Sequence, residues 1–165
     1  MQDNQLSQQM KQGMRRLASG VSVLSATLSD ASPFAMTVSS VTSVSDNPPS
    51  LLVCINRQIL RHEELLPSGS HFAVNLLDQD QTDVSNLCAG RLQDQDRLSL
   101  GQWQKDNWLV LTDSQASFCC TTDQVMNYGT HVILIGRIQQ VMIHRDQVAP
   151  LLYANGQYGT FKPLA

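Results

Sequence analysis

The sequence predicts an α+β protein built mainly on an antiparallel sheet or barrel. Segments with the alternating or continuous apolar patterns of strands outnumber the helical segments, and the helices do not alternate regularly with the strands. Short turn signals separate neighbouring strands, as hairpins require. The 165 residues suffice for one sizeable core, so we expect a single domain over residues 1–165.

In the N-terminal half, Leu6, Met10 and Leu17 recur on one side of a predicted helix, and polar residues fill the other side. Pro48-Pro49 breaks the strand pattern before a short continuous apolar run, which is typical of a strand buried on both faces. The predicted elements, in chain order, are a helix over 3–19 that ends near Gly20, strands over 21–26, 34–45 and 51–55, and a short helix over 57–66.

In the C-terminal half, the dipeptide Asn155-Gly156 is a strong signal for a tight hairpin turn. The predicted elements are a strand over 72–76, a helix over 79–89, an irregular polar excursion over 91–108, strands over 116–126 and 130–143, and a final hairpin over 151–158.

Charge and composition argue against several classes of protein. The net charge is −3 and no cluster of lysine and arginine occurs, so nucleic acid is not an expected partner. No apolar run approaches the ~20 residues of a membrane span, and the N-terminus lacks the apolar core of a secretory signal. We therefore expect a cytoplasmic protein that has no membrane or nucleic-acid partner.

The four cysteines are Cys54, Cys88, Cys119 and Cys120, and none of them forms a Cys-x-x-Cys pair. Adjacent residues of a strand point to opposite faces, which is poor geometry for a shared metal, and the four histidines are scattered. We expect free thiols and no metal site. Rossmann-type glycine spacing and a nucleophile elbow are also missing, so a nucleotide would have to bind in another way.

Hydroxyl residues dominate the predicted strand between Met36 and Ser45. Alternation places Thr37, Ser39, Val41 and Ser43 on one face. Buried hydroxyls need hydrogen-bond partners, so this face suits either solvent or a flat polar ligand that the backbone approaches closely. The residues alone leave both interpretations open.

Arg57 and Arg61 follow the 51–55 strand, at the expected beginning of a helix. Free N–H groups at a helix N-terminus, together with arginines, bind phosphate. The alternative is that both arginines lie on a solvated face.

Two further segments contain residues that suit ligand binding. Ala89-Gly90 ends a predicted helix, which either lets the backbone approach a ligand or only stops the helix. His131 follows Gly129-Thr130 at the start of a strand, where it either donates a hydrogen bond to a ligand or has a structural role.

Taken in order, these segments resemble one family, the short-chain flavin reductases. These are the reductase components of two-component flavin-dependent monooxygenases, and the likeness is greatest to the 4-hydroxyphenylacetate 3-monooxygenase reductase component. It covers about residues 10–160. The segments that carry it are 18–24, the hydroxyl strand 36–45, 47–56, 72–77, Cys88-Ala89-Gly90, Gly129-Thr130-His131 and 151–158.

The resemblance implies an FMN-binding split β-barrel with flanking helices, a homodimer, FMN or FAD as the flavin, and NADH or NADPH as the hydride donor. The residues that it assigns to the flavin are Thr37, Val38, Ser39, Ser40, Val41, Ser43, Cys54, Asn56, Arg57, Gln58, Ala89, Gly90 and Arg97. The residues that it assigns to the nicotinamide nucleotide are His131 and Tyr158. No residue is assigned as a catalytic acid or base, because hydride passes directly between the two rings.

The implied activity is that of an NAD(P)H:flavin oxidoreductase. It would supply reduced flavin to a separate monooxygenase that acts on a phenolic substrate, as in aromatic hydrocarbon catabolism. One alternative is a non-enzymatic split-barrel protein that binds flavin or haem. Another is a hydrolase with a Cys88–His131 pair, although neither residue lies in a known nucleophile motif.

Overall fold

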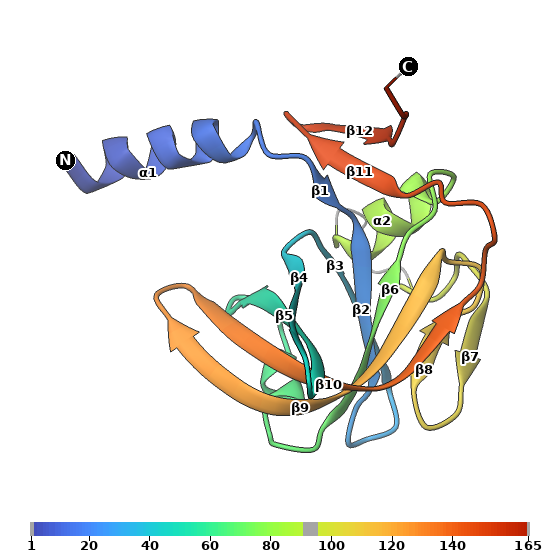
Figure 1. The fold of residues 1–165 in the computed structure, drawn as a ribbon. Coiled ribbons are helices and arrows are strands. Elements are labelled where there is room, and N and C mark those ends of the chain that lie inside the picture. Colours follow the sequence, from blue (N-terminus) through green and yellow to red (C-terminus); the bar gives the residue numbers. More distant parts are fainter. Residues whose placement is uncertain (1, 91–95, 165) are drawn as a thin grey trace.

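The computed structural model describes residues 2–90 and 96–164, and its main element is a curved antiparallel sheet of seven strands (Figure 1). The strand order is β3-β2-β6-β9-β10-β5-β4, so β3 and β4, which are neighbours in the chain, lie at opposite edges. The strands are β2 (Ser22–Thr27), β3 (Pro33–Val38), β4 (Val41–Asp46), β5 (Pro49–Asn56), β6 (His71–Leu76), β9 (Ala116–Tyr128) and β10 (His131–Ile143). The expected class, α+β with a mostly antiparallel split barrel, is confirmed.

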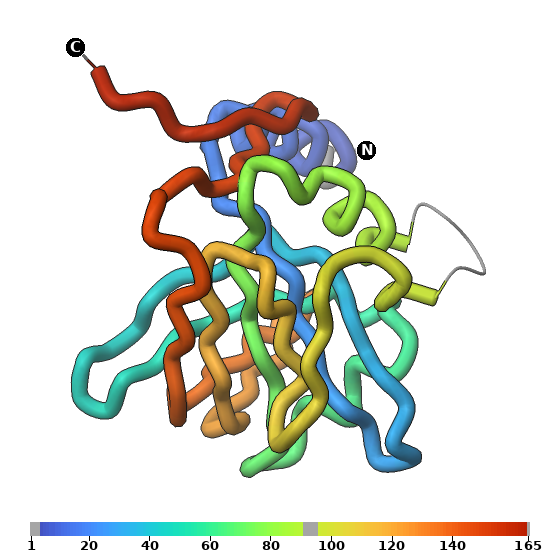
Figure 2. The backbone as a smooth tube through the Cα atoms, turned by 90° about the vertical axis from the view of Figure 1, so that its right-hand side faces the viewer, coloured from blue at the N-terminus to red at the C-terminus, as the bar shows by residue number. Residues whose placement is uncertain are grey.

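Smaller elements gather at one end of this sheet (Figure 2). There, β1 (Ser19–Gly20) pairs with the C-terminal hairpin of β11 (Leu151–Ala154) and β12 (Gln157–Thr160). The remaining elements are α1 (Gln2–Met14), the 3₁₀ helix η1 (His62–Leu65), α2 (Thr82–Cys88), β7 (Trp103–Lys105) and β8 (Leu109–Leu111). No described helix is long and apolar enough to cross a membrane.

Two large apolar clusters and a smaller third one around Val110 hold the fold together. Leu24, Ile55, Phe72 and Leu134, from four strands, lie in the cluster that the curved sheet encloses. A second cluster packs α2 and β11 against the start of β2. Burial of these side chains supplies the main driving force for folding.

Helix α1 has a different environment, because it extends away from the sheet (Figure 1). Its apolar residues Leu6, Met10 and Met14 each keep more than half of their surface exposed. An amphipathic helix normally buries that side. The apolar side of α1 is therefore available for a ligand or a partner.

Four predicted elements differ in the structure. The first helix ends at Met14 instead of near Gly20, because Ser19 and Gly20 pair with β11. The strand predicted over 34–45 is divided into β3 and β4. The described part of the 91–108 excursion contains β7, which pairs with β8, whereas residues 91–95 lie outside the described residues.

The helix predicted over 57–66 is also wrong. The Asn56 side chain accepts a hydrogen bond from the Gln58 N–H, which favours a turn there, and Arg61 has a φ of 66°. Only the single 3₁₀ turn of η1 remains. The final hairpin is confirmed, with positive φ angles at both Asn155 and Gly156.

Gly136 shows how closely the core is packed. It lies next to a register shift in β10, and a Cβ atom added there would overlap the Phe72 ring and lie 3.1 Å from the Cys120 Cβ. We expect Gly136→Ala to lower the free energy of unfolding by about 1–3 kcal/mol, the usual cost of overpacking, as measured by urea denaturation.

A double-mutant cycle tests the cause of this loss. Adding Phe72→Leu should make Gly136→Ala less destabilising than it is alone, because the smaller side chain leaves space. Gly159→Ala is the control, because no heavy atom lies within 4 Å of its added Cβ. Equal losses with and without Phe72→Leu would contradict this packing.

Candidate functional site

The two edges of the seven-stranded sheet meet at Ser39 and Ser40, which join β3 to β4. Ser40 Oγ donates to the Cys54 carbonyl at 3.0 Å and accepts from the Cys54 N–H at 3.2 Å. The hydroxyl thus extends the β4–β5 pairing by one residue, and strict alternation does not continue through 34–45. Each edge strand leaves the backbone groups of its outer side without sheet partners.

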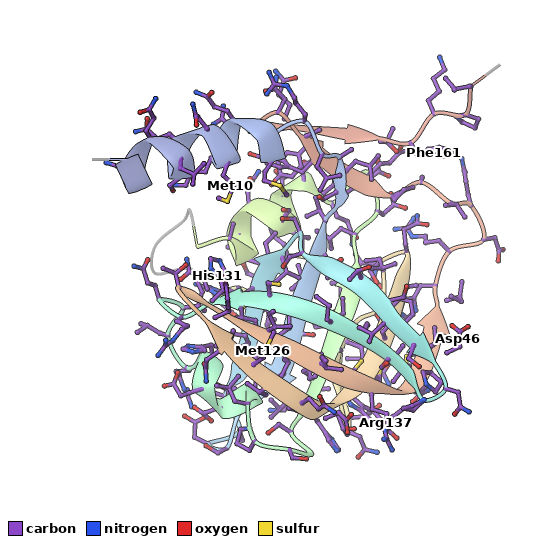
Figure 3. All side chains as sticks on the ribbon, turned by 60° about the vertical axis from the view of Figure 1, so that its left-hand side comes forward. Met10, Asp46, Met126, His131, Arg137 and Phe161 are labelled. Atoms are coloured by element: carbon purple, nitrogen blue, oxygen red, sulfur yellow. The ribbon has the colours of Figure 1, made fainter. Side chains whose placement is uncertain are left out.

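A groove of about 710 Å³ opens beside this junction and beneath α1. Met10 lies on the side of α1 that faces the sheet (Figure 3). We call this cavity the α1 groove. It is lined from α1 and the following segment by Met10, Lys11, Met14, Arg15, Leu17 and Ser19, from the sheet by Ser39, Ser40, Val41, Thr42, Leu52 and Cys54, and from the C-terminal hairpin by Tyr153, Ala154, Asn155 and Gly156.

A smaller hollow of about 130 Å³ adjoins the α1 groove, because Ser39 and Tyr153 line both. We call it the α2 hollow. Its other lining residues are Val21, Thr37, Ser85, Ala89 and Tyr158. The groove and the hollow together bring six of the predicted flavin residues to one region: Thr37, Ser39, Ser40, Val41, Cys54 and Ala89.

Hydrogen bonds to α2 hold the walls of the α2 hollow in position. Thr37 Oγ1 donates to the Ser85 carbonyl at 2.6 Å. The Tyr158 hydroxyl lies 2.9 Å from Ser85 Oγ and donates to Asn86 Oδ1 at 3.0 Å. Tyr158, which was expected near the nicotinamide, therefore lines the same hollow as Thr37, and His131 is not among the residues that line it.

Two predicted flavin residues, Gln58 and Arg97, line a separate hollow of about 360 Å³ beside β3. Arg97 Nη1 donates to the Ala35 carbonyl at 2.7 Å. Gly90 has a φ of +70°, so it ends α2 in the way that a C-terminal glycine does. It also lies close to this guanidinium. These residues lie beside the edge strand but do not line the α1 groove.

The segments after β5 and after β9 lie side by side. His131 is directly opposite Asn56 in the β5–β10 pairing, and the Arg57 N–H donates to the Thr130 carbonyl at 3.0 Å. Arg57 and His131 are exposed. The sequence therefore identified two segments, far apart in the chain, that the fold joins.

Two other residues that were expected to bind the flavin do not line the α1 groove or the α2 hollow with their side chains. The Val38 side chain is buried in the main core, so only its backbone can meet a ligand. Ser43 is exposed on β4 and does not line the α1 groove.

Arg61 does not form the phosphate-binding helix N-terminus that the sequence suggested. Its guanidinium pairs with Asp30 at 3.0 Å and Glu64 at 2.8 Å. The hydrogen bond from Arg61 is the main reason why the pKa of Asp30 lies below its usual range. The charge of Arg61 is thus compensated by Asp30 of the turn between β2 and β3 and by Glu64 of η1.

The cysteines are free thiols, as expected. Burial raises the pKa of Cys88 and of Cys120 to about 12, and it also raises the pKa of Cys119. Cys88 is buried, whereas His131 is exposed at the end of a hairpin. The alternative of a Cys88–His131 hydrolase is therefore not supported, because a buried neutral thiol is a poor nucleophile.

These thiols allow a chemical test of the α1 groove. We expect iodoacetamide to label Cys54 in the native protein and to spare the three buried thiols, because reaction needs both access and thiolate. Bound FMN should slow the labelling of Cys54, which lines the groove. Mass spectrometry of tryptic peptides gives the site of labelling, and Cys54→Ser is the control. Labelling at an unchanged rate with saturating FMN would contradict a flavin in this groove.

Several lining residues were not predicted, in particular Met14, Leu17, Ser85 and Tyr153. The apolar side of the N-terminal helix was visible in the sequence, but its neighbours were not. Within the described ranges, no group of three or more His, Cys, Asp or Glu residues could hold a metal ion.

Known proteins are similar to this chain in both fold and sequence. Residues 14–162 match the family model for the flavin reductase like domain. The reductase component of an FADH(2)-dependent resorcinol hydroxylase from Rhizobium sp. (strain MTP-10005) is 38% identical over 161 residues, which are 96% of this chain and 89% of the relative. The FMN reductase (NADH) RutF of Acinetobacter baylyi is 34% identical over 153 residues, 92% of this chain and 80% of the relative.

A solved structure agrees with these relatives. The styrene monooxygenase flavin reductase of Pseudomonas putida S12 superposes with a TM-score of 0.81 and 26% identity, over 94% of this chain and 97% of the other. The split barrel, the groove at its open edges and this match define a flavin reductase fold. The chain belongs to the family of flavin reductase like domains, and the resemblance seen in the sequence is confirmed.

Proposed function

We propose that the protein is an NAD(P)H:flavin oxidoreductase that reduces FMN or FAD and releases the reduced flavin to a separate monooxygenase acting on an aromatic substrate. Its family and its relatives, which are named as reductases and as reductase components, support this activity. The observation that carries it is the groove where the two sheet edges meet, lined by the hydroxyl-rich segment and adjoining the α2 hollow.

The lining residues fit a flavin. The outer side of β3 and of β4 offers backbone N–H groups without sheet partners, which suit the polar edge of a flat ring and a negative charge that grows there. Met10, Met14 and Leu17 form an apolar wall, against which a ring can pack. When bound, the flavin supplies the hydride chemistry, and the protein supplies binding and orientation.

His131 is proposed to bind and orient the nicotinamide nucleotide. We expect His131→Ala to raise the KM for NADH about three- to tenfold, the value of one hydrogen bond, and to leave flavin affinity unchanged. Steady-state kinetics and a flavin fluorescence titration measure the two effects. Loss of flavin binding with an unchanged KM for NADH would contradict this role.

We also propose that the protein is a cytoplasmic homodimer. Ile133 of β10 is paired with Met126 of β9, and Ile135 of β10 is opposite Leu52 of β5, so apolar residues continue along one face of the sheet. The exposed side of Met10 on α1 lies over this face (Figure 3). Each copy thus offers an apolar helix and an apolar sheet face on the same side, which a two-fold axis can pair reciprocally.

The proposed location in the cytoplasm is supported by the cysteines, because four free thiols agree with a reducing compartment.

Light scattering after size exclusion tests the dimer. Met126→Glu should convert the dimer to monomers, since Met126 is 55% exposed within this face. Val148→Glu, at a position that is 75% exposed outside the face, is the control. A monomeric unaltered protein would contradict the proposal.

The loss of NADH absorbance in the presence of catalytic protein tests the activity. We expect oxidation that depends on added FMN or FAD, and comparison of the two flavins and of NADH with NADPH gives the specificity. Binding of flavin without oxidation would instead favour a non-enzymatic split-barrel protein. A dialysis membrane that separates the protein from a monooxygenase tests the release of the flavin. Under anaerobic conditions, reduced flavin should cross the membrane and reach the monooxygenase, although the two proteins never touch.

A further inference from the structure

The Gly129–Thr130 turn between β9 and β10 positions a hydroxyl against His131. Thr130 Oγ1 lies 2.9 Å from His131 Nδ1. The imidazole is exposed, and no other side-chain partner of this ring is found in the described part of the chain. The ring therefore has one fixed nitrogen, Nδ1, and its other nitrogen, Nε2, remains available.

The turn itself is held in position. Gly129 has a φ of 54° and is followed by a threonine with negative φ, as in a type II′ hairpin turn. Arg57, which directly follows β5, donates its backbone N–H to the Thr130 carbonyl at 3.0 Å, and its guanidinium lies 3.5 Å from the Gly129 carbonyl. These contacts restrain the backbone from which the Thr130 hydroxyl meets the imidazole.

His131 lies in a row of three residues on one face of the sheet. Asn56 of β5 is opposite it on one side and Tyr128 of β9 is opposite it on the other. Figure 3 shows His131 on the face that α1 overhangs, which is also the face of the α1 groove. A donor on His131 thus lies on the side from which a nucleotide would approach the proposed flavin.

We propose that Thr130 is a positioning residue that donates its hydroxyl to His131 Nδ1 and so holds the neutral imidazole in the Nε2–H tautomer. The hydrogen bond at one ring nitrogen determines which nitrogen carries the proton. The outward Nε2–H then donates to an acceptor of the nicotinamide nucleotide, whose phosphate and carboxamide oxygens are acceptors. The second step rests on the proposed function, whereas the tautomer does not.

The opposite assignment has a different consequence. If Nδ1 carried the proton and donated to Thr130 Oγ1, Nε2 would present a lone pair, which repels phosphate and carboxamide oxygens. The two assignments differ in an observable quantity, the proton on each ring nitrogen.

Long-range ¹H–¹⁵N correlation spectra of the full-length protein test the tautomer directly, without NADH or flavin. Spectra recorded at pH 8.5, with His131→Gln to assign the signals, should show His131 as the Nε2–H tautomer. Thr130→Val keeps the β-branched shape but removes the hydroxyl, so it should increase the Nδ1–H population. Thr130→Ser should restore the original spectrum, and Thr27→Val, at an exposed threonine of β2, should leave it unchanged.

Kinetics test the consequence for the nucleotide. Thr130→Val should raise the KM for NADH about three- to tenfold, with little change in kcat or in flavin affinity, and Thr130→Ser should restore it. An Nδ1–H tautomer in the unaltered protein, or a tautomer unchanged in Thr130→Val, would overturn the proposal. An altered tautomer with an unchanged KM would overturn the role in nucleotide binding. A protein with the Nε2–H tautomer but no NADH oxidation would refute the proposed function and leave the tautomer assignment in place.

Discussion

Replacing Asn75 by leucine is expected to lower the free energy of unfolding by about 2–4 kcal/mol, although leucine is apolar, similar in size to asparagine and would be buried. Asn75 has no exposed surface. Its amide nitrogen donates to the Val23 carbonyl and to Ser25 Oγ, and its oxygen accepts from the Leu111 N–H and from Ser117 Oγ. Leucine removes the acceptor of the Leu111 N–H, and an unpaired buried polar group costs about 1–3 kcal/mol. Ser25 Oγ keeps its bond to the Leu109 carbonyl and Ser117 Oγ keeps His144 Nε2, so these two hydroxyls lose only one of their partners.

Asn75 adds side-chain hydrogen bonds to the sheet, in which β6 already pairs with β2 and β9, and it also reaches β8, which lies outside this sheet. Val23 and Ser25 belong to β2, Leu111 to β8 and Ser117 to β9, so one amide connects three strands to β6. Chemical denaturation measures the loss, and Asn127→Leu, at an exposed position of β9, is the matched control. Asn75→Leu with the stability of the unaltered protein would mean that these hydrogen bonds contribute no net stability.

Ala89→Phe should weaken flavin binding about ten- to a hundredfold while the protein stays folded. Ala89 is exposed, ends α2 and lines the α2 hollow beside Thr37 and Ser39. The hollow has a volume of only about 130 Å³, so a benzyl group would fill it and displace any ligand there. Fluorescence titration with FMN and FAD measures the affinity, and thermal denaturation verifies the fold.

A phenylalanine at a position of α2 that does not line the hollow distinguishes blockage of the flavin site from damage to the helix. Asp83 is exposed in the first turn of α2 and does not line the hollow, so Asp83→Phe should bind flavin normally. Normal flavin affinity in Ala89→Phe would show that the flavin lies elsewhere, and the proposed site would then be wrong.

The hairpins show what local sequence can predict. Asn155-Gly156 predicts a tight turn because only residues that tolerate positive φ fit it, and the structure has that turn. The apolar alternation over 130–143 correctly predicts β10, because alternation follows from the strand backbone itself. In both cases the residues that determine the backbone conformation lie within a few positions of the element that they form.

The strand predicted over 34–45 and the helix predicted over 57–66 failed for the opposite reason. The segment divides at Ser39 and Ser40 because β3 pairs with β2 at one edge of the sheet, whereas β4 pairs with β5 at the other edge. The predicted helix fails because Arg61 takes a left-handed backbone conformation, and its guanidinium pairs with Asp30, about thirty residues earlier in the chain. Local propensity contains no information about partners at such distances.

The sequence by itself determined the class of fold, most of the strands, the family, and the segments from which the candidate site is made. Tertiary structure alone decided which of those residues meet: it gathers Ser39, Cys54 and Ala89 around adjoining cavities, directs Gln58 and Arg97 to another hollow, and binds Tyr158 to α2. Side-chain patterns along a chain report the periodicity of each element, which is a short-range property. The meeting of two sheet edges depends on the curvature of all seven strands, and that curvature comes from packing and from hydrogen bonds between distant residues.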